Sequence, residues 1–237
     1  MPAPKTVAKI QPTGAKVVRG PHAERTAAMR QRLIDAAIVS LYELGYAATT
    51  TQVVTDRAGV SRGAILHHFP TKVDLMVAVA EYAAKHQDRT IRKALADTPA
   101  GMPVYLALTG ATWEVTTQAP AVALLEVMMA TRADHALAER LPEVVQAFEA
   151  KQRADVWRLA QEAGVTDKAT VEAMVRLHRA AMRGLAIELN LSHNRAEVEA
   201  SLRLLEHYKS RLTGELVTIP PGESLIDPAA PARPRRH

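Results

Sequence analysis

The residues best suited to chemistry lie between Gly45 and Lys72, a segment that contains Arg62, His67 and His68. Ser61 is a typical helix N-cap residue, and Ile65 and Phe69, four residues apart in the helix that follows, share a face that we expect to be buried. The opposite face then presents Arg62, Gly63, Leu66 and His67, with Ala64 nearby. Arginine pairs bidentately with guanine and small residues allow close backbone approach, so this pattern predicts a reader of the DNA major groove.

Two short helices in this segment have the dimensions of a helix-turn-helix. The run Thr49–Thr51 supplies N-cap hydroxyls for the first helix, which we expect to end at Ala58. Gly59 permits the tight turn, and Val60 fills the gap between the helices. The alternative is an αα-hairpin inside an ordinary helical protein, because short helices joined by a glycine turn are common.

No residue pattern in the chain predicts catalysis. The chain has no cysteine, which excludes disulfides, thiolate zinc sites and thiol nucleophiles. The motifs of serine hydrolases, zinc proteases, P-loops and dinucleotide-binding loops are absent. His67 and His68 are adjacent and point about 100° apart on a helix, so they do not easily share a metal ion. Carboxylate pairs such as Glu197 and Glu199 are typical of a solvated helix face. We therefore expect no enzymatic activity, metal or cofactor.

The distribution of charge also favours a polyanion-binding module. The 237 residues carry a net charge of +5. Residues 1–72 contain ten Lys or Arg against four Asp or Glu, whereas residues 73–227 contain seventeen against twenty-one. A basic first third on a mildly acidic body suggests a nucleic-acid-binding module joined to another unit, although a solvated basic surface is the alternative.

Composition and punctuation predict an all-helical chain. Hydrophobic residues make up 48% of the chain and aromatic residues 4%, and alanine, leucine, glutamate and arginine favour helices. No stretch approaches the roughly 20 apolar residues of a membrane span, and no apolar signal segment follows the first lysines, so we expect a soluble cytoplasmic protein. Beyond the two short helices, the expected helices span about 25–44, 72–96, 103–118, 120–132, 136–163, 168–190 and 195–213.

The segment Leu33–Leu75 closely resembles the N-terminal DNA-binding domain of TetR-type transcriptional regulators. The features that carry the resemblance occur with unbroken spacing: Gly45-Tyr46, Thr49-Thr50, Ala58 to Ser61, Gly63, His68-Phe69 and Thr71-Lys72. The resemblance implies an all-α fold with an N-terminal three-helix DNA-binding domain and a C-terminal helical domain for ligand binding and dimerisation. The expected division is a disordered basic arm over 1–22, the helix-turn-helix domain over 23–72, the effector and dimerisation domain over 73–215 and a disordered proline-rich tail over 216–237.

The resemblance also implies a role for each DNA-facing position. The base-reading positions are held by Arg62, Gly63 and Ala64. Backbone contacts, with an occasional base contact at the start of the motif, fall on Thr51, Gln52, His67, His68 and Lys72. Leu66 departs from the family, which usually has a tyrosine there whose phenol bonds a phosphate. A leucine cannot make that bond, but it can pack on a thymine methyl group.

Two helices of the body are candidates for a dimer interface. The helix of about 168–190 has two apolar stripes, formed by Val171, Val175, His178, Met182 and Leu185 and by Met174, Leu177 and Ala181. The last helix offers Val198, Leu202, Leu205, Tyr208 and Leu212. The resemblance implies that these helices pair with their copies in a homodimer; the alternative is that they pack only within their own chain.

Candidate effector-binding residues lie in the middle helices and in the helix of about 168–190. Adaptable methionines and large aromatic side chains suit a ligand cavity or an ordinary core, which makes candidates of Trp113, Met128, Met129, Phe148, Trp157 and His178. Glu126, within an apolar run, faces either the cavity or solvent. The expected function is a ligand-responsive regulator that binds operator DNA, most simply a repressor that a small molecule of unspecified class releases. The alternative is a helical ligand-binding or scaffolding protein without specific operator binding.

Overall fold

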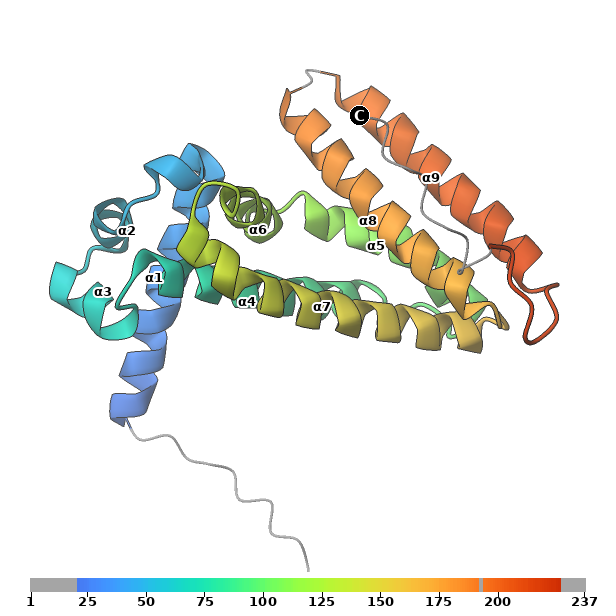
Figure 1. Ribbon diagram of the computed structural model, residues 1–237, viewed down its shortest axis with the longest axis horizontal. Coiled ribbons are helices and arrows are strands. Elements are labelled where there is room, and N and C mark those ends of the chain that lie inside the picture. The colour runs from blue at the N-terminus through green and yellow to red at the C-terminus, as the bar shows by residue number, and fades with distance from the viewer. Residues whose placement is uncertain (1–20, 192–193, 227–237) are drawn as a thin grey trace, which may run out of the picture.

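The computed structural model describes residues 21–191 and 194–226 (Figure 1). Within these ranges the chain is all-α, as expected, and contains no strand. Its helices are α1 Pro21–Ala48, α2 Thr51–Ala58, α3 Arg62–His68, α4 Lys72–Ala94, α5 Met102–Thr116, α6 Ala119–Ala130, α7 His135–Glu162, α8 Lys168–Leu191 and α9 Arg195–Leu216. The expected arm falls mostly on residues 1–20, outside the described residues, but Pro21 and His22 belong to the first turn of α1 rather than to the arm.

The short helices begin and end at the residues that the sequence marks. Gly45 interrupts α1 with φ 74° and ψ 177°, a backbone conformation that is essentially restricted to glycine, before the chain resumes helical turns to Ala48. The Thr50 side chain accepts a hydrogen bond from the Val53 N–H (3.2 Å) at the start of α2. Ser61 does the same for the Ala64 N–H (3.2 Å) at the start of α3. These caps fix where α3 begins, and therefore which of its residues face outward.

The long helix α4 runs from the helix-turn-helix into the body (Figure 1). It begins with a capping box, in which Thr71 accepts from the Asp74 N–H (3.1 Å) and Asp74 accepts from the Thr71 N–H (2.9 Å). Its expected apolar positions Leu75, Met76 and Val79 are buried. The first turn of α4 is thus held at the base of the helix-turn-helix while its remainder forms part of the body.

One hydrophobic core joins the helix-turn-helix to the first body helices. Leu33, Ile34 and Leu41 of α1 pack in the same cluster as Ile65 of α3 and Leu75 of α4. Helices α6 and α7 contribute Ala123, Leu124, Val127, Leu137 and Leu141 to it. Because these side chains form one continuous core, the position of α3 is tied to α6 and α7 as well as to α4.

The remaining helices form the other end of the molecule. Helices α8 and α9 are an antiparallel pair that packs on α5, and α8 also packs on α7 (Figure 1). One cluster there surrounds Tyr105 and Leu216, and another joins Trp113 of α5 to Met182 of α8 and Val198 of α9. Both α8 and α9 therefore pack on α5.

The structure corrects the expected tail, which was placed at 216–237. Leu216 is buried at the end of α9, and the segment to residue 226 folds back onto the start of α8. Asp167 accepts hydrogen bonds from the Ser224 hydroxyl (2.8 Å) and the Leu225 N–H (2.7 Å), and Thr166 donates to the Ile219 carbonyl (3.2 Å). Proline content alone led to the prediction of disorder, whereas these hydrogen bonds fix the backbone. Residues 227–237 lie outside the described residues.

Candidate nucleic-acid interface and body cavity

Helix α3 buries one face and exposes the other, as its spacing predicts. Ile65 and the following Phe69 are buried against α1 and α4. The outward residues Arg62, Gly63, Leu66 and His67 are exposed, and Ala64 and His68 are half-buried. The Leu66 side chain is 47% exposed. The chain therefore presents a short helix whose solvent face combines a cation, a glycine and an apolar side chain.

Two residues of this face are not required by the fold. The Arg62 guanidinium has no hydrogen-bond or ion-pair partner among residues 21–191 and 194–226. A methyl group at Gly63 would lie 3.8 Å from its nearest neighbour, the Ser61 hydroxyl, which is an ordinary contact. An alanine would therefore fit at Gly63 without strain and would favour the helix. Both residues are therefore exposed without a structural requirement for their side-chain type.

The end of α3 carries a cluster that includes one residue missed in the sequence. The rings of His67 and His68 meet edge to face, with centroids 5.2 Å apart. The guanidinium of Arg30 in α1 lies 5.0 Å from the centroid of the Phe69 ring. Burial, together with the charges of His67 and Arg30, lowers the pKa of His68. Arg30 adds a cation beside the exposed face of α3. The sequence could not indicate this, because Arg30 lies in a different helix, far from α3 along the chain.

Two other predicted DNA contacts, Thr51 and Gln52, lie at the start of α2. Thr51 is half-buried at the first position of α2, and Gln52 is exposed beside it. The Gln52 amide donates to the Asp56 carboxylate (2.8 Å), which holds the side chain along the helix surface. Arg57 forms an ion pair with Glu43 (2.5 Å), so its charge is shared with α1.

Lys72 begins α4, as expected, but its ammonium already has a contact within the chain. The Lys72 Nζ donates to the Tyr46 carbonyl (2.9 Å) and lies 3.9 Å from the centroid of the Tyr46 ring. Burial lowers the pKa of Lys72, and the nearby Asp134 carboxylate opposes that shift. Lys72 is therefore a link between α4 and α1 as well as a candidate DNA contact.

Glu126 contacts the helix-turn-helix domain and not the cavity, which corrects its assignment as a ligand-binding residue. Its carboxylate accepts a hydrogen bond from the Tyr46 N–H (3.2 Å), just after the break in α1. The Tyr46 hydroxyl donates to Asp134 (2.6 Å), in the turn between α6 and α7. This hydroxyl bond is the main cause of the lowered pKa of Asp134. The end of α1 is thus held by polar contacts from α6 and from the turn that follows it.

A cavity of about 120 Å³ lies in the body and is lined by residues of each helix from α4 to α9. Three predicted ligand residues line it: Met128, Phe148 and His178. Apolar side chains from four helices complete much of the wall: Leu108, Val122, Leu125, Val156, Met174, Val175 and Met182. The polar part of the wall consists of Gln87, Thr112, Thr116, Gln152, His178, Arg179, Arg183 and Lys209. A mostly apolar space with a few polar groups is typical of a small-molecule site.

The other predicted ligand residues lie elsewhere. Trp113 packs with α8 and α9 in a separate cluster, and Trp157 packs near Tyr105 at the end of the body. Met129 is 54% exposed. Residue type alone does not distinguish a cavity wall from a core, because both require large apolar side chains. The sequence analysis did not predict Arg179 and Arg183 as cavity residues, although their charge bears directly on which ligand can bind.

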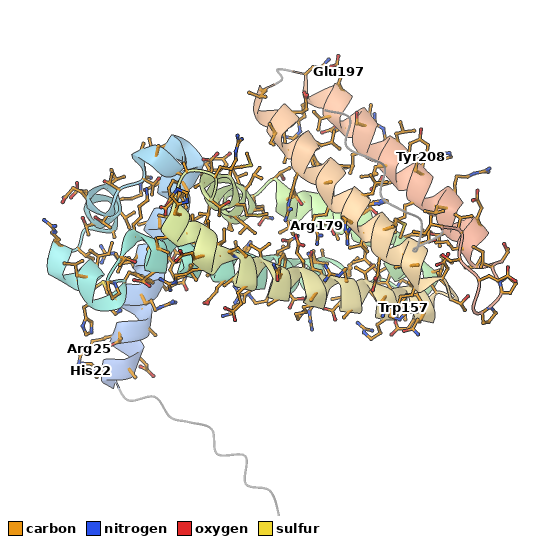
Figure 2. The ribbon with its side chains drawn as sticks, viewed as in Figure 1. His22, Arg25, Trp157, Arg179, Glu197 and Tyr208 are labelled. Atoms are coloured by element: carbon orange, nitrogen blue, oxygen red, sulfur yellow. The ribbon has the colours of Figure 1, made fainter. Side chains whose placement is uncertain are left out.

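Three cationic side chains line the wall: Lys209 is buried, and Arg179 and Arg183 are half-buried. Arg179 and Arg183 of α8 share the Glu149 carboxylate of α7, at 3.1 and 3.5 Å, and Figure 2 shows Arg179 between these two helices. Burial lowers the pKa of Arg179, whereas Glu149 opposes the shift. Lys209 of α9 donates to the Tyr105 carbonyl, and burial lowers the pKa of its ammonium to about 7.

Part of the surface of α8 and α9 is apolar and exposed. Leu177 of α8 is 65% exposed, and Leu204 and Tyr208 of α9 are 50% and 61% exposed. Tyr208 points away from the body in Figure 2. Ile187 and Leu191 extend the apolar residues along α8. No helix in the described part of the chain is both long and apolar enough to cross a membrane.

The all-helical fold contains two short helices, α2 and α3, in a helix-turn-helix arrangement, and comparisons with known proteins show which regulators the chain resembles. Residues 33–79 match the family model "Bacterial regulatory proteins, tetR family". An uncharacterized HTH-type transcriptional regulator of Mycobacterium tuberculosis is 38% identical over 120 residues, which are 51% of this chain and 62% of that protein. Residues 33–79 are thus similar to the tetR family of bacterial regulatory proteins, and the match to the mycobacterial regulator spans 62% of that protein's length.

Solved structures share the fold over most of the chain. The structure of a TetR-family transcriptional regulator from Rhodococcus sp. covers 79% of this chain and 99% of its own, with a TM-score of 0.65 and 14% identity. A transcriptional regulator from Saccharomonospora viridis, solved in complex with choline, covers 78% and 96%, with a TM-score of 0.61 and 15% identity. At these identities the likeness establishes the fold alone.

Proposed function

We propose that this chain is a homodimeric transcriptional repressor that a small-molecule effector releases from its operator. The observation that carries the proposal is the face of α3, where Arg62 and Gly63 are exposed and serve no purpose in the isolated fold. An exposed glycine in a helix costs stability relative to alanine, so a gain in binding has to offset it. The match of residues 33–79 to the TetR family supports the same function.

The proposed DNA contacts divide into two groups. Arg62, Gly63 and Ala64 read bases in the major groove, with Leu66 packed on a thymine methyl in place of a phosphate bond. Thr51, Gln52, His67, His68 and Lys72 contact the sugar-phosphate backbone. Arg30 joins the second group because its guanidinium lies beside the end of α3. Such a protein works in the cytoplasm, where bacterial DNA is found.

A second copy of the chain is the proposed partner of α8 and α9. Leu177, Leu204 and Tyr208 are large apolar side chains on adjacent helices, and each exposes at least half of its surface. Contact with the same helices of a second copy removes this apolar surface from water. A dimer also sets two α3 helices at a fixed separation, which lets both engage half-sites about one helical turn apart or a multiple of it.

The proposed effector site is the cavity in the body, and α6 provides a route from it to α1. Val122, Leu125 and Met128 of α6 line the cavity, while Glu126 of the same helix binds the Tyr46 N–H. A ligand that moves α6 therefore acts on the end of α1 as well as on α4. Release from DNA requires the ligand to bind the DNA-incompetent arrangement more tightly than the competent one.

An electrophoretic shift assay with the DNA that flanks the gene of this protein tests the DNA-binding part of the proposal. We expect one or more flanking fragments to bind the full-length protein in the presence of excess unrelated duplex. The matched control is Arg62→Ala, which should lose preference for the same fragment. Equal affinity of the wild-type protein for flanking and unrelated DNA would instead favour a ligand-binding or scaffolding protein without specific operator binding.

A further inference from the structure

The cavity wall has an excess of positive charge. Arg179, Arg183 and Lys209 line it, and no aspartate or glutamate does within the described residues. Glu149 lies behind the two arginines and is their only ion-pair partner in that part of the chain. One carboxylate thus serves two guanidinium groups, and Glu206 is the acidic neighbour of Lys209.

Arg179 also has an unused hydrogen-bond donor at this position. Its Nη2 binds Glu149, but its Nη1 is buried and has no hydrogen-bond partner among residues 21–191 and 194–226. A buried donor without an acceptor is destabilising, and more so when the group is charged. A single water molecule could accept one hydrogen bond there, but it would leave the excess charge in place. An anionic acceptor would both accept a hydrogen bond from Nη1 and balance the excess positive charge of the wall.

His178 adds a second buried polar atom to the same wall. Its Nδ1 lies 3.0 Å from the Met174 carbonyl, and because a carbonyl only accepts, Nδ1 carries the proton. The buried Nε2 atom forms no hydrogen bond of ordinary geometry in the described structure, although the backbone of Leu205 is close enough to the ring to oppose the lowering of its pKa. Because a neutral ring with a proton on Nδ1 leaves Nε2 as an acceptor, His178 suits a ligand hydroxyl or protonated group rather than the anion itself.

The remainder of the wall limits the size and character of the ligand. The cavity volume of about 120 Å³ is close to the roughly 150 Å³ that accommodates benzene in a protein core. Met128, Phe148 and Val122 supply apolar contacts for the ligand body. A second hollow of about 250 Å³, lined by residues of α4, α5 and α7, shares Phe148 and Gln152 with this cavity.

We propose that this cavity binds a small monocarboxylate with an apolar body, such as an aromatic or short aliphatic acid. The carboxylate accepts hydrogen bonds from Arg179 and Arg183, and the apolar body packs toward Met128 and Phe148. The inference rests on the proposed function in one respect, because it names the chemical class of the effector. The binding site itself does not depend on DNA binding.

Isothermal titration of the full-length protein without DNA tests the chemical class. The probes are benzoate, phenylacetate and hexanoate, each paired with its amide of nearly identical shape, and benzylamine as the cationic control. We expect at least one acid to bind about tenfold or more tightly than its own amide, because the amide cannot form charge-assisted bonds with the arginines. If no acid binds more tightly than its amide, or if benzylamine binds best, the proposal is wrong.

Two variants with opposite expected effects locate the carboxylate. Arg179→Gln should weaken binding of the acid at least tenfold with little effect on the amide. Glu149→Gln should strengthen binding of the acid, because it removes the carboxylate that competes for both arginines. Arg176→Gln is the matched control, since Arg176 is an exposed arginine of α8 outside the wall. Thermal unfolding of each variant checks folding, and equal affinity of all four proteins for the acid would contradict the assigned position.

Failure of this inference and failure of the proposed function give different results. An acid that binds in an Arg179-dependent manner but leaves operator affinity unchanged supports the site and contradicts the effector role. An operator complex that is released by amides or amines, and not by acids, supports ligand-responsive regulation and overturns the carboxylate assignment.

Discussion

The carboxylate of Glu126 in α6 accepts a hydrogen bond from the backbone N–H of Tyr46, 3.2 Å away and directly after the break in α1 at Gly45. Leu125, the residue before Glu126, lines the body cavity. One turn of α6 thus contacts the helix-turn-helix domain on one side and the cavity on the other. Helix α6 thus links the cavity to the helix-turn-helix domain in addition to the covalent connection through α4.

Glu126→Ala is expected to weaken the coupling between ligand and DNA. The substitution leaves the partly buried Tyr46 N–H without its acceptor and frees the end of α1 from α6, at a stability cost of about 1–3 kcal/mol. The measurement is the ratio of operator affinities with and without a saturating ligand that releases the wild-type protein. Met129→Ala, which alters an exposed residue of the same helix, is the control. A wild-type ratio in Glu126→Ala would show that this contact does not transmit the signal.

Arg62→Ala is expected to reduce discrimination at one base pair by about 1–3 kcal/mol while the dimer stays folded. The reason is that Arg62 is exposed and forms no hydrogen bond or ion pair within the described residues that its loss could disturb. Competition binding with operators substituted one position at a time measures the effect. Lys72→Ala provides the contrast, because loss of a phosphate contact should weaken all duplexes alike and reduce the salt slope by about one. Unchanged base preference in Arg62→Ala would remove this residue from the readout.

Gly63→Ala should preserve or raise the stability of the protein while it weakens DNA binding. The methyl group meets only ordinary contacts in the free protein, and alanine favours a helix over glycine by about 0.5–1 kcal/mol, so the free energy of unfolding should rise or stay the same. Operator affinity should nevertheless fall, because the added methyl group prevents the close backbone approach to the bases. Denaturant unfolding and a shift assay on the same sample measure both quantities. A variant that gains stability and keeps full operator affinity would mean that no DNA group approaches this position closely.

Leu204→Glu is expected to dissociate the dimer. The side chain is 50% exposed on α9, and an interface between two copies would bury its carboxylate without a partner, at a cost of several kcal/mol. The dimer dissociation constant should rise at least about 100-fold, as sedimentation velocity at several concentrations would show. Leu44→Glu, a similar change at a residue 48% exposed on α1, should leave the dimer intact. Dissociation by the control and not by Leu204→Glu would place the interface elsewhere.

Lys209 should make stability depend on pH between about 7 and 10. Burial lowers its pKa in the folded state from the ordinary 10.5 to about 7, so the unfolded state binds more protons in this range and stability rises with pH. The charged or titratable groups near Lys209 include Glu206, Arg179, Arg183 and the imidazole of His178. The unfolding free energy of the wild type relative to Lys209→Met should therefore increase by up to about 1.4 kcal/mol per pH unit.

Denaturant unfolding of both proteins at intervals from pH 6 to 10 gives this difference. Lys168→Met, which removes an exposed ammonium from α8, serves as the control for loss of charge at a surface position. A wild-type advantage that does not change with pH would show that the buried ammonium keeps its proton throughout this range.

The starts of the short helices and the face that α3 exposes follow from local sequence patterns. Thr50, Ser61 and Thr71 cap helices through bonds to backbone groups three residues away, and Gly45 adopts a backbone conformation that other residues rarely reach. The burial of Ile65 and Phe69 follows from their spacing of four. These features depend on interactions within a few residues, which is why their positions could be predicted without the fold.

Which residues meet between helices depends instead on how the helices pack together. Arg179 and Arg183 have the spacing of an ordinary solvated helix face, and they line the cavity because α8 packs against α7 and brings Glu149 behind them. Glu126 lies in an apolar run that suits a cavity, yet the approach of α6 to the end of α1 directs it to the Tyr46 N–H. A helical pattern specifies the face on which a side chain lies but not the helix that covers that face, because this depends on how distant segments pack together.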